Sequence, residues 1–146
     1  MLMVSPNGLD LIRKFEGTRL KPYFDIAGRV TIGTGHLITA GEATKFAAGI
    51  TQRQADNLLK HDLLVAENAV ARAVKVTLKQ GEFDALVSFT FNLGAVRLLA
   101  SSLRMRLNRG DRQGAAQEFT RWVYAGGRRV SGLMARRMAE KALFMS

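Results

Sequence analysis

Residues 15–36 read FEGTRLKPYFDIAGRVTIGTGH, and this stretch decides the fold prediction. Upstream of Glu16, apolar residues recur every three to four positions, so this acid is expected near the end of an amphipathic helix. Downstream, Pro22 begins an extended segment, Gly28 marks a turn, and the β-branched residues 30–32 suit a second strand. The stretch therefore predicts a helix followed by a β-hairpin.

Two carboxylates and one hydroxyl of this stretch are candidate catalytic groups. Glu16 stands at the expected helix end, Asp25 at the hairpin turn and Thr31 in the second strand. If the hairpin folds back beside the helix, they converge as hydrolysis of a glycosidic bond requires, with one carboxyl donating a proton and another activating water. A solvated helix-end acid and a turn aspartate are the alternative. Clustering around the hairpin, with Tyr23 and His36 nearby, favours a site.

Composition limits the remaining possibilities. A chain of 146 residues with 47% apolar and 23% charged residues predicts one folded domain. It contains no cysteine, and His36 and His61 are its two imidazoles, so no metal site is expected. A net charge of +10 favours polyanionic partners: nucleic acid, anionic lipid or an acidic wall polymer.

No stretch predicts membrane insertion or secretion. The longest apolar runs fall well short of the roughly 18 residues of a membrane span. The first ten residues lack the basic start and apolar core of a secretory signal. We therefore expect synthesis and folding in a bacterial cytoplasm.

The rest of the chain predicts helices. A capping-box pattern at Thr51 and Gln54 begins an apolar stripe of some twenty residues, the longest helix expected. Residues 83–93 are apolar on nearly every side and stop at Gly94, which predicts the buried centre of a second lobe. Further helices are expected over 98–107, from Asp111 to about Trp122, and from Ser131 onward, with Gly126-Gly127 as a break.

The spacing E-x8-D-x5-T from Glu16 to Thr31, with the ending T-I-G-x-G-H at His36, resembles the signature of phage-type lysozymes, or endolysins, of glycoside hydrolase family 24. Residues 83–86 and 91–94 resemble that family's central helix. The segment from Gly132 to Leu143 resembles the last helix of its lambdoid-phage members.

This resemblance implies an α+β, lysozyme-like fold in one domain, 1–146. A small N-terminal lobe with a β-hairpin would cover about 14–58. A long helix would connect it to a helical C-terminal lobe of about 59–146, on which the first helix packs. The active-site cleft would lie between the lobes.

The resemblance also implies roles for matching residues. Glu16 matches the general acid, Asp25 the carboxylate that holds or activates the attacking water, and Thr31 the hydroxyl that positions it, in an inverting reaction. A second base or a metal ligand is the alternative reading of His36, but a supporting role is favoured, with its ring paired to Asp62.

Substrate-binding positions follow from the same comparison. Leu37, Phe91 and Ser102 match positions that line the family's sugar-binding cleft, although Leu37 and Phe91 fit an apolar core equally well. Glu118, or a neighbour, replaces an asparagine of the relatives, which puts that contact in doubt.

The function implied is a muramidase that hydrolyses the β-1,4 bond between N-acetylmuramic acid and N-acetylglucosamine in peptidoglycan. It would need no cofactor, act as a monomer, and reach the wall after release through a holin lesion.

One alternative is a basic helical nucleic-acid-binding protein, although the basic residues are scattered and no recognition helix stands out, so no nucleic acid is expected. Others are a lytic transglycosylase and lysis through a cationic C-terminal helix, with Arg128-Arg129 and Arg136-Arg137 contacting anionic lipid or peptide-stem carboxylates.

Overall fold

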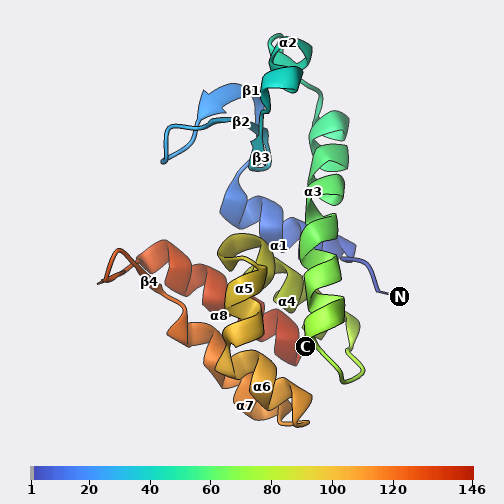
Figure 1. Cartoon of the computed structure of the whole chain (residues 1–146), viewed down its shortest axis with the longest axis vertical. Coiled ribbons are helices and arrows are strands. Elements are labelled where there is room, and N and C mark those ends of the chain that lie inside the picture. The colour runs from blue at the N-terminus through green and yellow to red at the C-terminus, as the bar shows by residue number, and fades with distance from the viewer. Residues whose placement is uncertain (1) are drawn as a thin grey trace. The chain divides into compact units, whose positions relative to one another are not determined.

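The computed structural model describes residues 2–146, which divide into two compact units. The first, here called the sheet unit, is Ile12–Leu64. The second, the helical unit, is Val65–Ser146 together with residues 2–11. Figure 1 labels the elements of both. No helix in this described part of the chain combines the length and apolar character needed to cross a membrane.

The sheet unit contains a three-stranded antiparallel sheet of order β1-β2-β3. The predicted hairpin is present, and a short third strand extends it. The elements in chain order are the end of α1 (Pro6–Glu16), β1 (Arg19–Phe24), β2 (Val30–Gly33), β3 (His36–Leu37), a 3₁₀ turn η1 (Ala40–Glu42), α2 (Ala43–Phe46) and the first part of α3 (Gln52–Ala73).

Strand register places three residues side by side across this sheet. Thr31 in β2 lies opposite Tyr23 in β1 and opposite Leu37 in β3. Because directly opposed residues of antiparallel strands project to the same face, the three side chains share one face. The register shifts between Arg19 and Tyr23, so the first part of β1 pairs irregularly.

Two glycines allow the turns that join these strands. Gly28, at φ 78°, closes the β1–β2 turn, where its N–H donates to the carbonyl of Asp25 at 2.9 Å. Gly35, at φ 77°, lies in the turn between β2 and β3. Positive φ carries a steric penalty for residues with a Cβ, so these turns favour glycine.

Apolar packing and one ion pair fix the helix ends of the sheet unit. Ile12 and Ile32 are completely buried, as is Ala55 on α3. Arg13 Nε lies 3.2 Å from Asp56 Oδ1, which ties the end of α1 to the start of α3. The end of α1, which carries Glu16, is thereby held in place.

The helical unit is built around α4 (Gln80–Leu93), whose residues 82–90 are all buried, as its apolar sequence predicts. The other elements of this unit are α5 (Ala95–Ala100), α6 (Ser102–Asn108), α7 (Arg112–Glu118), η2 (Phe119–Arg121), β4 (Tyr124–Ala125), β5 (Arg128–Arg129) and α8 (Ser131–Met145). Phe89 on α4 packs edge-to-face against Phe119 and Trp122, with ring centroids 5.6 Å apart in both pairs. These aromatic contacts join α4 to η2.

One sequence prediction for this unit was wrong. The single helix expected over 98–107 is two helices, because Ser101 is extended and its hydroxyl accepts a hydrogen bond from Arg104 N at 3.1 Å. This N-cap ends α5 and begins α6. The break expected at Gly126-Gly127 is present, and it takes the form of a turn in a small hairpin that the sequence did not predict, in which β4 and β5 pair antiparallel.

The expected surface cluster of C-terminal arginines was also wrong in part. Arg136 and Arg137 on α8 are buried, with 4% and 0% of their surface exposed. Their guanidinium nitrogens lie 3.3 and 2.7 Å from the carboxylate of buried Glu140, which also accepts a hydrogen bond from Ser88 on α4 at 2.5 Å. A buried charge requires a partner, so these arginines serve the packing of α8 on α4.

Loss of the Glu140 carboxylate should therefore destabilise the fold. Glu140→Ala removes the carboxylate that pairs with the buried guanidinium groups of Arg136 and Arg137. Removal of one partner of a buried ion pair typically lowers the free energy of unfolding by about 3–5 kcal/mol. Urea unfolding followed by circular dichroism measures the change. Lys141→Ala, the next residue on α8, is the control and should change stability by less than about 0.5 kcal/mol. Equal stability of the two variants would contradict this account.

Candidate active site

Asp25 follows β1 and is held by a single residue across the turn. Its Oδ1 accepts a hydrogen bond from Arg29 N at 2.8 Å, and its Oδ2 accepts one from Arg29 Nε at 3.0 Å. The backbone hydrogen bond from Arg29, followed by the hydrogen bond and charge of its guanidinium, lowers the pKa of Asp25 and outweighs desolvation. Asp25 is thus kept ionised at neutral pH.

Thr31 is buried in the middle strand, and its hydroxyl has a fixed direction. Thr31 Oγ1 donates to the carbonyl of Arg29 at 2.9 Å. The same carbonyl accepts the N–H of Asp25 at 2.9 Å. Asp25 and Thr31 are therefore joined through one peptide group.

Glu16 ends α1, and its carboxyl reaches the turn between β2 and β3. A Cβ placed on Gly35 would lie 3.4 Å from Oε1 of Glu16, so glycine leaves room for this carboxyl. The hydroxyls of Thr18 and Thr34 are 2.8 Å apart, which fixes the chain after α1 beside the same turn. Local contacts within the sheet unit thus set the position of Glu16.

Tyr23 links the two acids. Burial raises the pKa of its hydroxyl; the charge of Arg19 lowers it, and the negative charges of Glu16 and Asp25 raise it further. Both carboxylates therefore lie close enough to Tyr23 to act on it, and Thr31 lies opposite it in the sheet. The structure brings the three residues predicted to be catalytic together around Tyr23.

His36 lies between two carboxylates. Its Nδ1 is 2.7 Å from Asp62 Oδ2, the partner expected from the sequence, and its Nε2 is 3.2 Å from Glu42 Oε1. Carboxylates only accept hydrogen bonds, so both contacts form together only when both ring nitrogens carry protons, and the raised pKa of His36 favours this imidazolium form. His36 thus fits a supporting role.

Glu42 was missed as the second partner, although the sequence contains a signal for it. Glu42 Oε1 also accepts hydrogen bonds from the backbone N–H and the hydroxyl of Thr39, at 3.1 Å each. Thr39 and Glu42 have the T-x-x-E spacing of a capping box. The pattern places Glu42 at the start of a helical turn, but only the tertiary structure brings it to His36.

The pKa of His36 makes the stability of the sheet unit depend on pH. Burial opposes protonation of the ring, but hydrogen bonds and charges from Asp62 and Glu42 outweigh it and raise the pKa. Because the pKa of His36 is higher in the folded than in the unfolded chain, the protonated ring stabilises the fold. This stabilisation is fully present below the unfolded-state pKa of about 6.5 and is lost as pH rises through the folded-state pKa. The pKa of Glu42 is lowered, first by the backbone hydrogen bond from Thr39 and then by the contacts with His36, although desolvation opposes both. The contribution of the Glu42 carboxylate to stability is therefore lost in acid.

Glu42→Gln should therefore lower the Tm most at about pH 5–6, where ring and carboxylate are both charged, and less at pH 9. The glutamine preserves the capping box, so the pH-dependent part reports the contact with His36. Thermal unfolding at several pH values measures the difference. Lys60→Gln is the control, because Lys60 is exposed on α3 of the same unit, and it should leave the profile unchanged. A loss of Tm that is constant across pH would contradict this reading.

The predicted substrate-binding residues fall in different units. Leu37 belongs to the sheet unit, where 43% of it is exposed beside Thr31. Phe91 is half-buried on α4, and Ser102 is half-buried at the start of α6, both in the helical unit. Ser102 lines two adjoining hollows together with Glu118 and Arg121.

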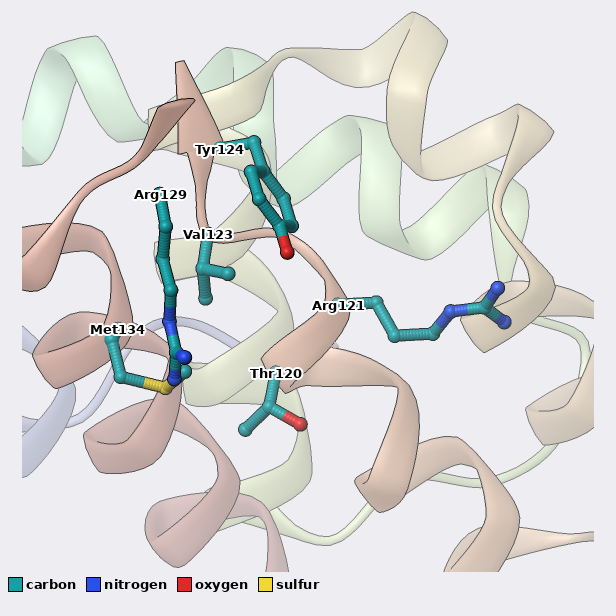
Figure 2. Close-up of a pocket in the computed structure, with 6 residues that line it drawn as sticks. All are labelled: Thr120, Arg121, Val123, Tyr124, Arg129 and Met134. Carbon is teal, nitrogen blue, oxygen red and sulfur yellow. The ribbon is translucent and has the colours of Figure 1, made fainter. Parts of the chain in front are cut away.

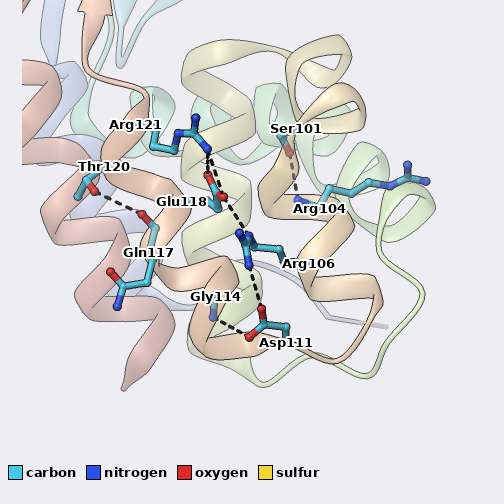
Figure 3. A network of polar contacts seen from close by, with 9 residues as sticks. All are labelled: Ser101, Arg104, Arg106, Asp111, Gly114, Gln117, Glu118, Thr120 and Arg121. Carbon is cyan, nitrogen blue, oxygen red and sulfur yellow. Dashed lines mark hydrogen bonds and ion pairs between the residues drawn. The ribbon is translucent and has the colours of Figure 1, made fainter.

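Glu118 is the centre of a polar network (Figure 3), and it lines the same two hollows as Ser102. Its carboxylate is nearly buried and lies 3.0 Å from Arg106 Nε and 3.1 Å from Arg121 Nη1. Arg106 also pairs with Asp111 at 3.3 Å. An asparagine at position 118 would carry no charge to hold these guanidinium groups.

A further hollow of about 520 Å³ lies between η2, the β4–β5 hairpin and α8. Thr120, Tyr124, Arg129 and Met134 are among its lining residues (Figure 2). Figure 2 shows the side chain of Arg121 extending away from the others. In the part of the chain that the structure describes, no three His, Asp or Glu residues are grouped closely enough to hold a metal ion.

A small antiparallel sheet, a helical remainder and paired acids at the sheet define an enzyme of the lysozyme class. The chain belongs to the phage lysozyme family, whose model matches residues 13–140. The endolysin of Acyrthosiphon pisum secondary endosymbiont phage 1 is 41% identical over 149 residues, covering 98% of each chain.

Solved structures agree with this assignment. A mutant of P22 lysozyme matches with a TM-score of 0.92 and 37% identity over 100% of both chains. The muramidase domain of SpmX from Asticaccaulis excentricus matches with a TM-score of 0.88 and 37% identity, covering 100% of this chain and 99% of that one. The family, the lysozyme-like fold and the glycoside hydrolase class predicted from the sequence are confirmed. No relative supports the nucleic-acid-binding alternative.

Proposed function

We propose that this lysozyme hydrolyses the β-1,4 bond between N-acetylmuramic acid and N-acetylglucosamine in bacterial peptidoglycan, as a phage endolysin that lyses the host cell. The observation that carries the proposal is the group of Glu16, Asp25 and Thr31 around Tyr23. Relatives named endolysin and muramidase support the substrate.

Each of the three side chains has a distinct task in this proposal. Glu16 gives its proton to the leaving-group oxygen. Asp25, whose pKa is lowered by Arg29, remains a carboxylate and activates the attacking water. The hydroxyl of Thr31 positions that water. Both chemical tasks, proton donation and water activation, are met by side chains, so the reaction needs no cofactor.

The stereochemistry belongs to the same proposal. If water attacks directly, the sugar inverts at its anomeric carbon, and the two carboxyl groups must leave room for the water, at about 6.5–9.5 Å in inverting enzymes. Leu37, Phe91 and Ser102 would contact the sugars. Exposure of Leu37 and the hollows beside Ser102 support this assignment.

The cellular setting is proposed from the sequence. The enzyme would be made in the host cytoplasm, released through a holin lesion, and act on the wall as a monomer. Contact with anionic lipid would fall to Arg128 and Arg129, which are exposed on β5, because Arg136 and Arg137 are buried. This burial weighs against lysis mainly by the C-terminal helix.

Glu16→Gln should abolish lysis and leave the fold intact. Glutamine has nearly the same shape but no proton of suitable acidity to donate. The loss of turbidity of a peptidoglycan suspension measures activity, and circular dichroism with a Tm checks folding. Near-normal lysis by the variant would refute the assignment of Glu16. Killing of intact cells that survives the substitution would instead favour a membrane-directed mechanism.

The released products decide the reaction type. Hydrolysis should yield muropeptides with a reducing N-acetylmuramic acid end, because water adds across the bond. A lytic transglycosylase would yield an anhydro-muramic end and would have no use for Asp25. Mass spectrometry of digests by the wild type and by Asp25→Asn tests both points, and anhydro products from the wild type would overturn the proposed reaction.

A further inference from the structure

Arg29 makes more contacts with the proposed water-handling residues than any role in the turn requires. Its backbone N–H donates to Oδ1 of Asp25 and its Nε donates to Oδ2, at 2.8 and 3.0 Å. Its carbonyl accepts the N–H of Asp25 and the hydroxyl of Thr31, both at 2.9 Å. One residue therefore contacts Asp25 at three points and Thr31 at one.

The side-chain contact has a different purpose from the backbone contacts. The backbone hydrogen bonds close the hairpin and hold Oδ1. The hydrogen bond from Nε holds Oδ2 as well, so rotation of the carboxylate about its Cβ–Cγ bond would break two hydrogen bonds instead of one. Two carboxylate oxygens can together accept four hydrogen bonds. The backbone N–H of Arg29, its Nε and the backbone N–H of Ala27 take three of them, so one acceptor site remains for a water molecule.

Exposure indicates that this ion pair does not serve folding. The Arg29 side chain is 61% exposed, whereas that of Asp25 is 21% exposed. An ion pair of a long, solvated side chain contributes little to stability. The contact nevertheless sets the plane of a carboxylate whose orientation matters for attack by water.

We propose that Arg29 is a positioning residue, whose guanidinium fixes the rotation of the Asp25 carboxylate and keeps it ionised during hydrolysis. This inference rests on the proposed function of Asp25. The other groups that act on Asp25 are the backbone N–H of Ala27 and the hydroxyl of Tyr23, which in turn feels the charges of Arg19 and Glu16. None of these provides a second side-chain hydrogen bond to Oδ2.

The test compares Arg29→Gln with Arg29→Lys in the full-length enzyme. Arg29→Gln should lower kcat by between about tenfold and a hundredfold, the size of effect that misorientation produces, with little change in KM. The acid limb of its pH–rate profile should move to higher pH, since Asp25 loses the nearby positive charge. Arg29→Lys restores the charge without the planar guanidinium, so it should recover the acid limb but only part of kcat.

Arg53→Gln is the matched control, because Arg53 is an exposed arginine of the same unit, on α3. Like Arg29→Gln, it removes one positive charge, so it measures how far activity falls only because the enzyme is attracted less strongly to an anionic wall. If Arg29→Gln matches this control in kcat and in the acid limb, the inference is overturned. An increase in kcat would also overturn it, since the guanidinium would then be blocking Asp25.

An NMR titration of the Asp25 carboxyl carbon separates this inference from the proposed function. A higher pKa of Asp25 in Arg29→Gln than in the wild type, at unchanged Tm, supports the contact independently of activity; an unchanged pKa contradicts it. If Asp25→Asn keeps near-normal lysis, the proposed role of Asp25 fails, and the positioning role of Arg29 fails with it. If Asp25→Asn is inactive but Arg29→Gln is not impaired, only the inference about Arg29 fails.

Discussion

The antiparallel pairing of Tyr23 with Thr31 is the contact on which the candidate active site depends. Because the side-chain period of a strand is two, a slip of one residue would turn Thr31 to the other face of the sheet. The same slip would separate the N–H of Asp25 from the carbonyl of Arg29, which also accepts the hydroxyl of Thr31. Turn geometry prevents it: Gly28 at positive φ and the Asp25–Arg29 hydrogen bonds allow one register for the hairpin.

Charge is used differently in the two units. In the sheet unit, carboxylates are held in defined orientations by donors on neighbouring segments: Asp25 by Arg29, and Asp62 and Glu42 by His36. In the helical unit, Glu140 pairs with two buried arginines within the core. Much of the excess positive charge is thus left on exposed side chains such as Arg128 and Arg129, where it suits attraction to an anionic wall.

The sequence predicted the long helix, the buried central helix and the hairpin because each has a strong local pattern: a capping box with an apolar stripe, an apolar run closed by glycine, or β-branched residues after a turn. It failed at Ser101, where one hydroxyl capping a helix outweighs continued apolar periodicity. It predicted a break at Gly126-Gly127 but not the hairpin there, because a two-residue strand carries almost no pattern.

The sequence by itself determined the family, the fold class and the identity of Glu16, Asp25 and Thr31 as candidates, because residue types at fixed spacing carry that information. Only the tertiary structure decided which partners hold them. Arg29 was unremarkable as one arginine among many, and Glu42 was visible only as a helix cap, yet folding brings the first onto Asp25 and the second onto His36. It likewise decided that Arg136 and Arg137 are buried, since burial depends on what packs against α8 and not on the polarity of two adjacent residues.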